Sequence, residues 1–216
     1  MHIEPGFIAQ TKIMFANLMA GGVLLNYARE LVRRPADLIR TTLAALFFSI
    51  FMQSFSVSVG PSELHFVGAM VMYLSLGFIP TLFGFAAGLL LQGILFDPQD
   101  LMHLTINSLS LIVPLIAVHM LHGRKLRNEG LALSWKTILK LDAMYYSGLI
   151  AMVGFWLSIA EVATPFAAWL SFASSYLIIV LIEPLLTYSV IHLLKNHQNK
   201  AIVDTCFDIK SLNVVK

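Results

Sequence analysis

Charged residues are scarce in this sequence. Asp, Glu, Lys and Arg make up 12% of its 216 residues, whereas apolar residues make up 58%, and the mean hydropathy is +0.80. A soluble domain typically carries about 25% charged residues, because water-facing surface needs polar groups to cover it. The composition therefore excludes an ordinary water-soluble domain and favours a chain that folds in a lipid bilayer.

Cysteine is also nearly absent. The single Cys206 excludes an internal disulfide and any zinc site built from cysteine pairs. Basic runs with interleaved aromatic residues are missing, so we expect no nucleic-acid partner. The phosphate-binding motif Gly-x₄-Gly-Lys-Ser/Thr does not occur, so we expect the chain to hydrolyse no ATP itself. The first residues lack the basic segment and cleavage site of a secretory signal, and we expect them to be retained.

Apolar residues are concentrated in long blocks. A helix that crosses the roughly 30 Å hydrocarbon core needs about 20 residues. Breaks at proline, glycine and charged clusters predict an all-α polytopic membrane protein with one transmembrane bundle, 1–194, and a tail, 195–216. The seven predicted spans are 7–27, 41–59, 66–79, 81–96, 105–121, 141–160 and 169–194. Spans 66–79 and 81–96 are short, and we interpret them as a tight helical hairpin, with a re-entrant pair as the alternative.

The distribution of charge orients these spans. With seven spans, 13 of the 14 Lys and Arg residues fall on one side, in the segments 28–40, 122–140 and 195–216. The opposite loops, 60–65, 97–104 and 161–168, contain no Lys or Arg. By the positive-inside rule, the amino terminus is predicted to lie outside and the carboxyl terminus in the cytoplasm. We therefore predict a multi-pass protein of the cell membrane.

Small and ionisable residues within the spans predict contacts between helices. Gly84-x₃-Gly88 and the pair Gly21–Gly22 have the small side chains that let helix backbones approach closely. Ionisable groups at membrane depth are costly and usually face the bundle interior or a partner. We expect Lys12 either to reach the interface or to pair with Glu183 across the bundle. Asp142 lies near a predicted interface, where we expect it to be solvated.

Three of the seven histidines, His2, His65 and His103, map to the predicted outer side. His2 is unusual because the Met1 amine, the backbone amide of residue 2 and the imidazole lie within one residue of each other. Imidazole and amine nitrogens suit nickel, copper, cobalt and zinc, and an amide nitrogen joins when the metal displaces its proton. The amino terminus is therefore a candidate chelate for one divalent ion, with His65 as a candidate fourth donor.

The segments around these histidines resemble a known family. The start Met1-His2-Ile3-Glu4-Pro5-Gly6 resembles the Met-His-Ile-x-x-Gly start of the cobalt/nickel substrate-binding membrane subunits of energy-coupling-factor transporters, the CbiM/NikM family. Gly60-Pro61-Ser62-Glu63-Leu64-His65-Phe66-Val67-Gly68 is similar to the family's Gly-Thr-Ser-x-His-x-x-Gly. A weaker match covers residues 91–96 and Asn107. The resemblance extends through Leu121, and the last third matches only as hydrophobic helices.

This resemblance implies a metal site. Its ligands would be the Met1 amine, the His2 amide and imidazole, and His65, with Asn107 orienting a ligand. Two departures from the family pattern bear on metal choice. His65 stands three residues after Ser62 instead of two, which adds the carboxylate of Glu63, and Glu4–Pro5 makes the start more acidic and stiffer. Glu63 and Glu4 are therefore candidates for residues that lie beside the metal ligands. His103 has no counterpart in the family motif and is a further candidate.

The function implied is capture and uptake of a transition-metal ion, cobalt or nickel, by a subunit that is not an enzyme. The ion would be the transported substrate, with no organic cofactor. The partners implied are a transmembrane coupling subunit and cytoplasmic ATPases, for which the basic segments 28–40 and 122–140 are candidate docking surfaces. The alternative is a substrate-binding subunit or permease for a small organic solute such as a vitamin. Trp156, Trp169 and Tyr145–Tyr146 would line the pocket for such a solute.

Overall fold

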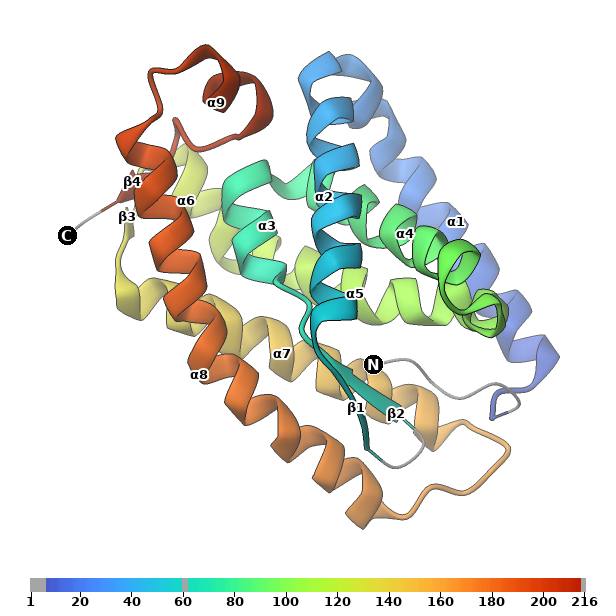
Figure 1. The fold of residues 1–216 in the computed structure, drawn as a ribbon. Helices are drawn as coiled ribbons and strands as arrows, with labels where there is room; N and C mark the ends of the chain where they lie inside the picture. Colours follow the sequence, from blue (N-terminus) through green and yellow to red (C-terminus); the bar gives the residue numbers. More distant parts are fainter. Residues whose placement is uncertain (1–6, 60–61, 215–216) are drawn as a thin grey trace.

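The computed structural model describes residues 7–59 and 62–214, and these residues are mostly helical. Their elements are α1 (Gln10–Arg33), α2 (Pro35–Ser54), β1 (Ser56–Val59), β2 (Ser62–His65), α3 (Ala69–Leu76), α4 (Phe78–Leu95), η1 (Pro98–His103), α5 (Leu104–Val118), η2 (His119–Gly123), α6 (Arg124–Asn128), β3 (Ala132–Leu133), α7 (Trp135–Ser158), α8 (Phe166–Asn196), α9 (Ala201–Cys206) and β4 (Asn213–Val214). Figure 1 shows a helical bundle with two distinct ends. We name the end with β1–β2 and the loop 159–165 the hairpin end, and the end with α6, α9 and β3–β4 the tail end.

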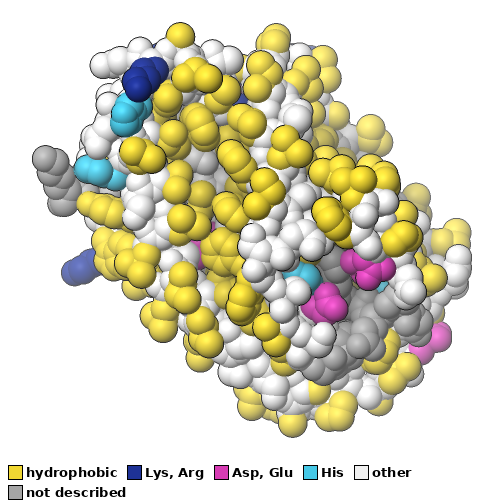
Figure 2. All heavy atoms as spheres, in the orientation of Figure 1, with side chains coloured by type: hydrophobic (Ala, Val, Ile, Leu, Met, Phe, Trp, Pro, Cys, Tyr) yellow, Lys and Arg dark blue, Asp and Glu magenta, His cyan; other side chains and the backbone are white. Residues whose placement is uncertain are grey.

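Five helices in the described residues are long and apolar enough to cross a membrane. They are α2, α4, the continuous helical segment Pro98–Asn128, α7 and α8. Large apolar side chains lie on the outside of the bundle, among them Leu18 and Leu25, which are 76% and 77% exposed, and apolar atoms cover much of the face in Figure 2. Such a surface suits lipid rather than water, so the structure supports a polytopic helical membrane protein.

Two of the seven predicted spans have no counterpart among these five helices. The span predicted at 66–79 contains α3 and the first two residues of α4. The eight residues of α3 extend about 12 Å and cannot cross the bilayer alone. The span predicted at 7–27 corresponds to α1, a 24-residue helix with charged residues at both ends, including Lys12 and Arg33. The break between α3 and α4 falls at Gly77, whose φ of 103° is a conformation that glycine adopts readily.

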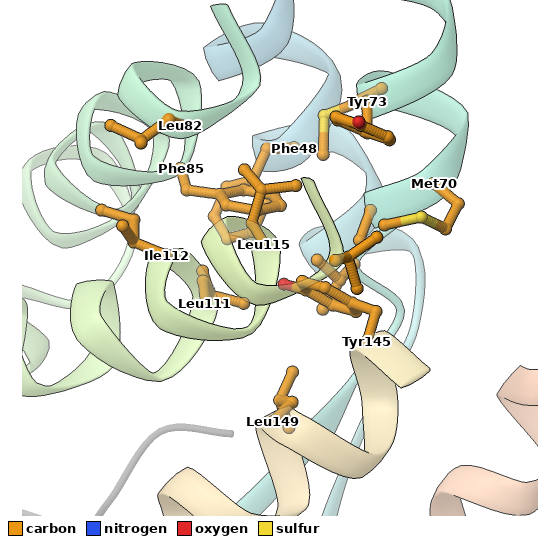
Figure 3. Close-up of a cluster of buried hydrophobic side chains, with 14 of the residues drawn as sticks. Phe48, Met70, Tyr73, Leu82, Phe85, Leu111, Ile112, Leu115, Tyr145 and Leu149 are labelled. Carbon is orange, nitrogen blue, oxygen red and sulfur yellow. The ribbon is translucent and has the colours of Figure 1, made fainter. Parts of the chain in front are cut away.

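The core lies where α2, α4, α5 and α7 meet. Figure 3 shows Phe48, Phe85, Leu111, Leu115 and Tyr145 converging there, and each of these side chains is buried. Phe48 and Phe85 pack edge to face, with ring centroids 5.4 Å apart, a favoured geometry for aromatic pairs. The apolar faces of these helices therefore fill the interior with one continuous core.

The small residues on α4 allow it to approach α2 closely. A Cβ atom at Gly84 would lie 2.3 Å from Ala44 Cβ, and one at Gly88 would lie 2.6 Å from the Phe48 ring. The predicted role of Gly84-x₃-Gly88 is thus confirmed. The same prediction for Gly21–Gly22 is wrong, because a Cβ at either position would meet nothing within 4 Å.

The ionisable residues of the interior pair differently from the prediction. Lys12 Nζ donates to Ile159 O at the hairpin end, whereas Glu183 accepts hydrogen bonds from the Met70 amide at 2.8 Å and from the Tyr146 hydroxyl. The predicted Lys12–Glu183 pair is therefore wrong. The prediction that Asp142 is solvated is also wrong, because Asp142 is fully buried beside Glu183.

The C-terminal segment folds back onto the bundle. Val203, Ile209 and Leu212 are buried, and β4 pairs in parallel with β3, with Asn213 opposite Ala132. Arg40 at the start of α2 donates to the carbonyls of Asp204, Thr205 and Phe207. The C-terminal segment, predicted as a tail, therefore packs against the bundle and covers its tail end.

Candidate metal-binding site

His65 is the predicted ligand that the structure describes most fully. It ends β2, which pairs antiparallel with β1 so that His65 faces Ser56 and Glu63 faces Ser58. Side chains two apart in a strand point to the same face, and Glu63 Oε2 lies 2.9 Å from His65 Nε2. The imidazole is buried, with 8% of the side chain exposed, and the carboxylate of Glu63 fixes the direction of its ring.

The contact with Glu63 also bears on which nitrogen can bind a metal. When Nε2 carries the hydrogen and donates it to Glu63, the lone pair of Nδ1 is available for a metal ion. Nδ1 itself lies 3.4 Å from Met52 O, so both ring nitrogens have a contact in the structure, and a metal ion at Nδ1 would replace the contact with Met52. A carboxylate on the far nitrogen of a histidine is the arrangement that orients metal-binding imidazoles in many proteins.

His103 and Asn107 form a second polar group near the start of α5. His103 ends η1 and Asn107 follows it by one helical turn, so that both side chains lie on one face. Each is only 1% exposed. Asn107 Oδ1 is buried and has no hydrogen-bond partner among the residues that the structure describes. A buried amide oxygen with unused bonding capacity is a group that a ligand, a water or an ion can satisfy.

The amino-terminal candidates Met1, His2 and Glu4 lie outside the described residues, so their role stays a prediction. The described chain begins at the hairpin end, where Phe7 O accepts a hydrogen bond of 2.9 Å from the Glu161 amide. This end also carries His65. Within residues 7–59 and 62–214, no three His, Cys, Asp or Glu side chains gather into a set that could hold a metal ion.

The aromatic residues considered for an organic pocket are packing residues in the structure. Tyr145 and Tyr146 are fully buried and stack edge to face at a centroid distance of 5.2 Å. Trp156 is 2% exposed, and Trp169 Nε1 donates to Ile150 O at 3.2 Å. They contribute to helix packing, and Trp169 also lines a cavity of about 380 Å³ together with Gly154 and Phe166.

Sequence reasoning missed one polar group in the interior, the Asp142–Glu183 pair with Tyr146. The signal was present in the spacing, because Asp142 and Tyr146 are four residues apart and share one face of α7. Glu183 supplies the acceptor at the amino terminus of α3, where the preceding Gly68 has no side chain to cap the helix. Its partner amide belongs to a residue 113 positions away, so local sequence could not reveal the contact.

The long apolar helices place the chain in the class of multi-pass helical membrane proteins. Residues 2–201 match the family model described as the cobalt uptake substrate-specific transmembrane region, CbiM. The match covers most of the chain, and the protein belongs to this family. It is therefore a cobalt uptake component and a multi-pass protein of the cell membrane. Comparisons with curated proteins and with solved structures gave no significant match.

Proposed function

We propose that this protein is the substrate-binding subunit of an energy-coupling-factor ABC transporter that captures Co²⁺ or Ni²⁺ outside the cell. The observation that carries the proposal is the buried His65, held by Glu63, in a chain of the cobalt uptake family. The hairpin end would face outward and the basic tail end would face the cytoplasm, in keeping with the positive-inside rule.

The proposed ligands are the Met1 amine, the His2 amide and imidazole, and the His65 imidazole. The first described residue, Phe7, is anchored at the hairpin end. The proposal requires Met1 and His2 to lie within reach of His65 from Phe7, and six residues span at most about 20 Å. Nitrogen donors of this type suit Co²⁺ and Ni²⁺. Asn107 and His103 would orient a ligand or its water.

The chain would act as a binding subunit without being an enzyme. A transmembrane coupling subunit and cytoplasmic ATPases would supply the energy, because the sequence contains no ATP-binding motif of the Gly-x₄-Gly-Lys type. The basic segments 28–40 and 122–140 would face these partners. Release of the ion into the cytoplasm would follow their ATP-driven conformational change.

The test is the metal content of the detergent-purified protein that carries a tag only at its carboxyl terminus. We expect about one cobalt or nickel per chain, and its loss in His65→Ala and in a form with one residue added before Met1. His197→Ala is the matched control, because His197 lies at the other end of the molecule, where its Nδ1 is hydrogen-bonded to Leu193 O. An extended protein that retains the metal as well as the native one would disprove the amino-terminal chelate.

A further inference from the structure

The carboxyl end of α3 is held by residues distant in sequence. The last carbonyls of a helix have no partner within the helix. In α3, Arg127 Nη2 donates to the carbonyls of Tyr73 and Leu74 at 3.0 and 3.2 Å. The amide of Asp208 donates to Ser75 O at 2.7 Å. Three of the four terminal carbonyls are therefore satisfied by α6 and by the C-terminal segment.

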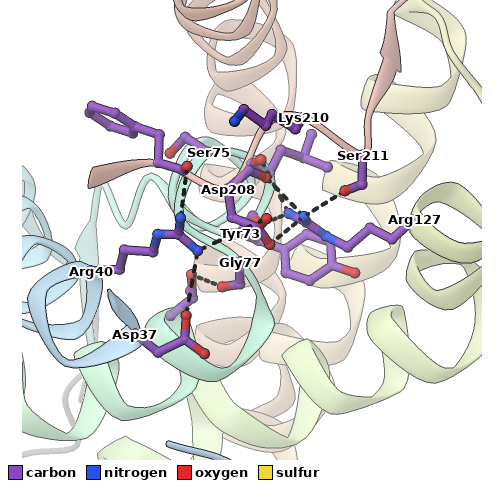
Figure 4. Close-up of polar contacts among 12 residues, drawn as sticks. Asp37, Arg40, Tyr73, Ser75, Gly77, Arg127, Asp208, Lys210 and Ser211 are labelled. Atoms are coloured by element: carbon purple, nitrogen blue, oxygen red, sulfur yellow. Dashed lines mark hydrogen bonds and ion pairs between the residues drawn. The ribbon is translucent and has the colours of Figure 1, made fainter. Parts of the chain in front are cut away.

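Asp208 connects the C-terminal segment to the bundle through its side chain as well. Its Oδ2 atom lies 2.7 Å from Arg127 Nη1, and its Oδ1 atom lies 4.0 Å from Arg40 Nη1. Figure 4 shows the carboxylate of Asp208 between the two guanidinium groups, next to Gly77 at the α3–α4 break. Asp208 thus links α2 and α6 through its side chain and holds the end of α3 through its backbone amide.

The amino end of α3 is held in the same manner. Glu183 on α8 accepts from the amide of Met70, and Met70 follows His65 by five positions. All eight residues of α3 are buried, and an eight-residue helix has little stability by itself in isolation. Contacts at its two ends therefore add to the packing of its buried side chains in fixing where α3 lies. A shift at its carboxyl end is transmitted along a rigid, close-packed element towards β2.

Space for such a shift exists at the tail end. A cavity of about 260 Å³ lies beside the α3–α4 break, and Asp37, Gly77, Arg127 and Asp208 are among its lining residues. The side chain of Asp208 is 38% exposed, so its contact with Arg127 lies at the edge of the bundle and not in its core. The family match ends at residue 201, so Asp208 lies in a part of the chain that the family model does not describe.

We infer that Asp208 and Arg127 are positioning residues for the metal site: through α3 they keep His65 in its metal-binding position at the opposite end. The C-terminal segment 201–214 thereby acts as a latch. Loss of the contact between Asp208 and Arg127 would weaken the retention of the ion. This inference rests on the proposed function, since it concerns retention of the same ion.

The experiment compares the release of radioactive cobalt from wild-type protein and from Asp208→Ala after addition of excess chelator. We expect release at least about fivefold faster in Asp208→Ala, the lower range of typical coupling between sites, and a rate closer to wild type in Asp208→Glu. Asp204→Asn is the matched control. It removes an exposed ion pair with Lys210 at 2.6 Å in the same segment, and we expect it to leave the rate unchanged.

A second measurement separates positioning from simple loss of stability. Amide hydrogen exchange across residues 62–72 is expected to accelerate in Asp208→Ala, although the substitution is at the other end of α3. Unchanged cobalt release in a folded Asp208→Ala protein would overturn the inference, even if its melting temperature fell. If wild-type protein held no cobalt, the proposed function would fail, and unchanged exchange at residues 62–65 would overturn the positioning role independently.

Discussion

Asp142 and Glu183 are two fully buried carboxyl groups that lie next to each other between α7 and α8. Two adjacent carboxylates in a low-dielectric interior repel each other strongly, so one of them holds a proton. Glu183 accepts from Met70 and Tyr146 and lies within hydrogen-bonding reach of Asp142, whose oxygens make no hydrogen bond to any other described residue. Glu183 is thus the acceptor of the pair, and Asp142 is the group expected to carry the proton.

This asymmetry predicts different effects for substitutions at the two positions. Asp142→Asn should leave the melting temperature in detergent close to that of wild type, because an amide has the size and donor capacity of a protonated carboxyl group. Glu183→Ala should lower it clearly, because each buried donor left unsatisfied costs about 1–3 kcal/mol. Equal damage from both substitutions would contradict the assignment.

The contact of Glu63 with His65 predicts a graded effect on cobalt affinity. Glu63→Ala should weaken binding about 10–100-fold, the usual effect of removing a group that orients a metal-binding histidine. Glu63→Gln keeps an acceptor for Nε2–H and should weaken binding less. Titration with cobalt measures the affinity of each variant. The control is Glu129→Ala, which changes an exposed glutamate at the tail end. An affinity unchanged in Glu63→Ala would mean that His65 is oriented by other contacts.

At the scale of elements, the packing of α2 on α4 depends on glycines that leave no room for a methyl group. Gly88→Ala would place a Cβ 2.6 Å from the Phe48 ring and 3.1 Å from Ala45 O. We expect a loss of about 1–3 kcal/mol in the free energy of unfolding, as is typical for overpacking. Gly21→Ala is the control: it meets open space within α1 and should stabilise the helix by about 0.5–1 kcal/mol. Thermal unfolding in detergent compares the two, and an equal response would show that close approach of α2 and α4 is not required.

At the scale of the whole molecule, labelling of the single cysteine tests which end of the protein faces the cytoplasm. Cys206 is partly exposed at the tail end, which we expect to face the cytoplasm. A membrane-impermeant maleimide should therefore fail to label intact cells and should label permeabilised ones. Ser58→Cys in a Cys206→Ser background places the thiol at the exposed β1 strand and should be labelled in intact cells. The reverse pattern would mean that the bundle is inserted with the hairpin end inside.

Sequence alone predicted those features that depend on composition and local pattern. The scarcity of charge and the long apolar blocks indicated a polytopic helical membrane protein. The spacing of Gly84 and Gly88 indicated that their helix approaches a neighbour closely, and the motif around His65 indicated the family. These predictions succeeded because helix formation and the burial of apolar side chains depend on residues that are close in the sequence. The pattern of those residues can therefore be recognised without the structure.

Only the tertiary structure decided which distant groups meet. It placed Glu183 on the amide of Met70 rather than on Lys12, buried Asp142, and folded the predicted tail onto the bundle through Asp208, Arg127 and Arg40. Each of these contacts joins residues far apart in the chain, and each exists because a buried polar group must find a partner wherever the folded chain supplies one. Apolar spans specify that helices form and where they lie relative to the bilayer, whereas the pairing of their few polar groups follows from how the helices pack.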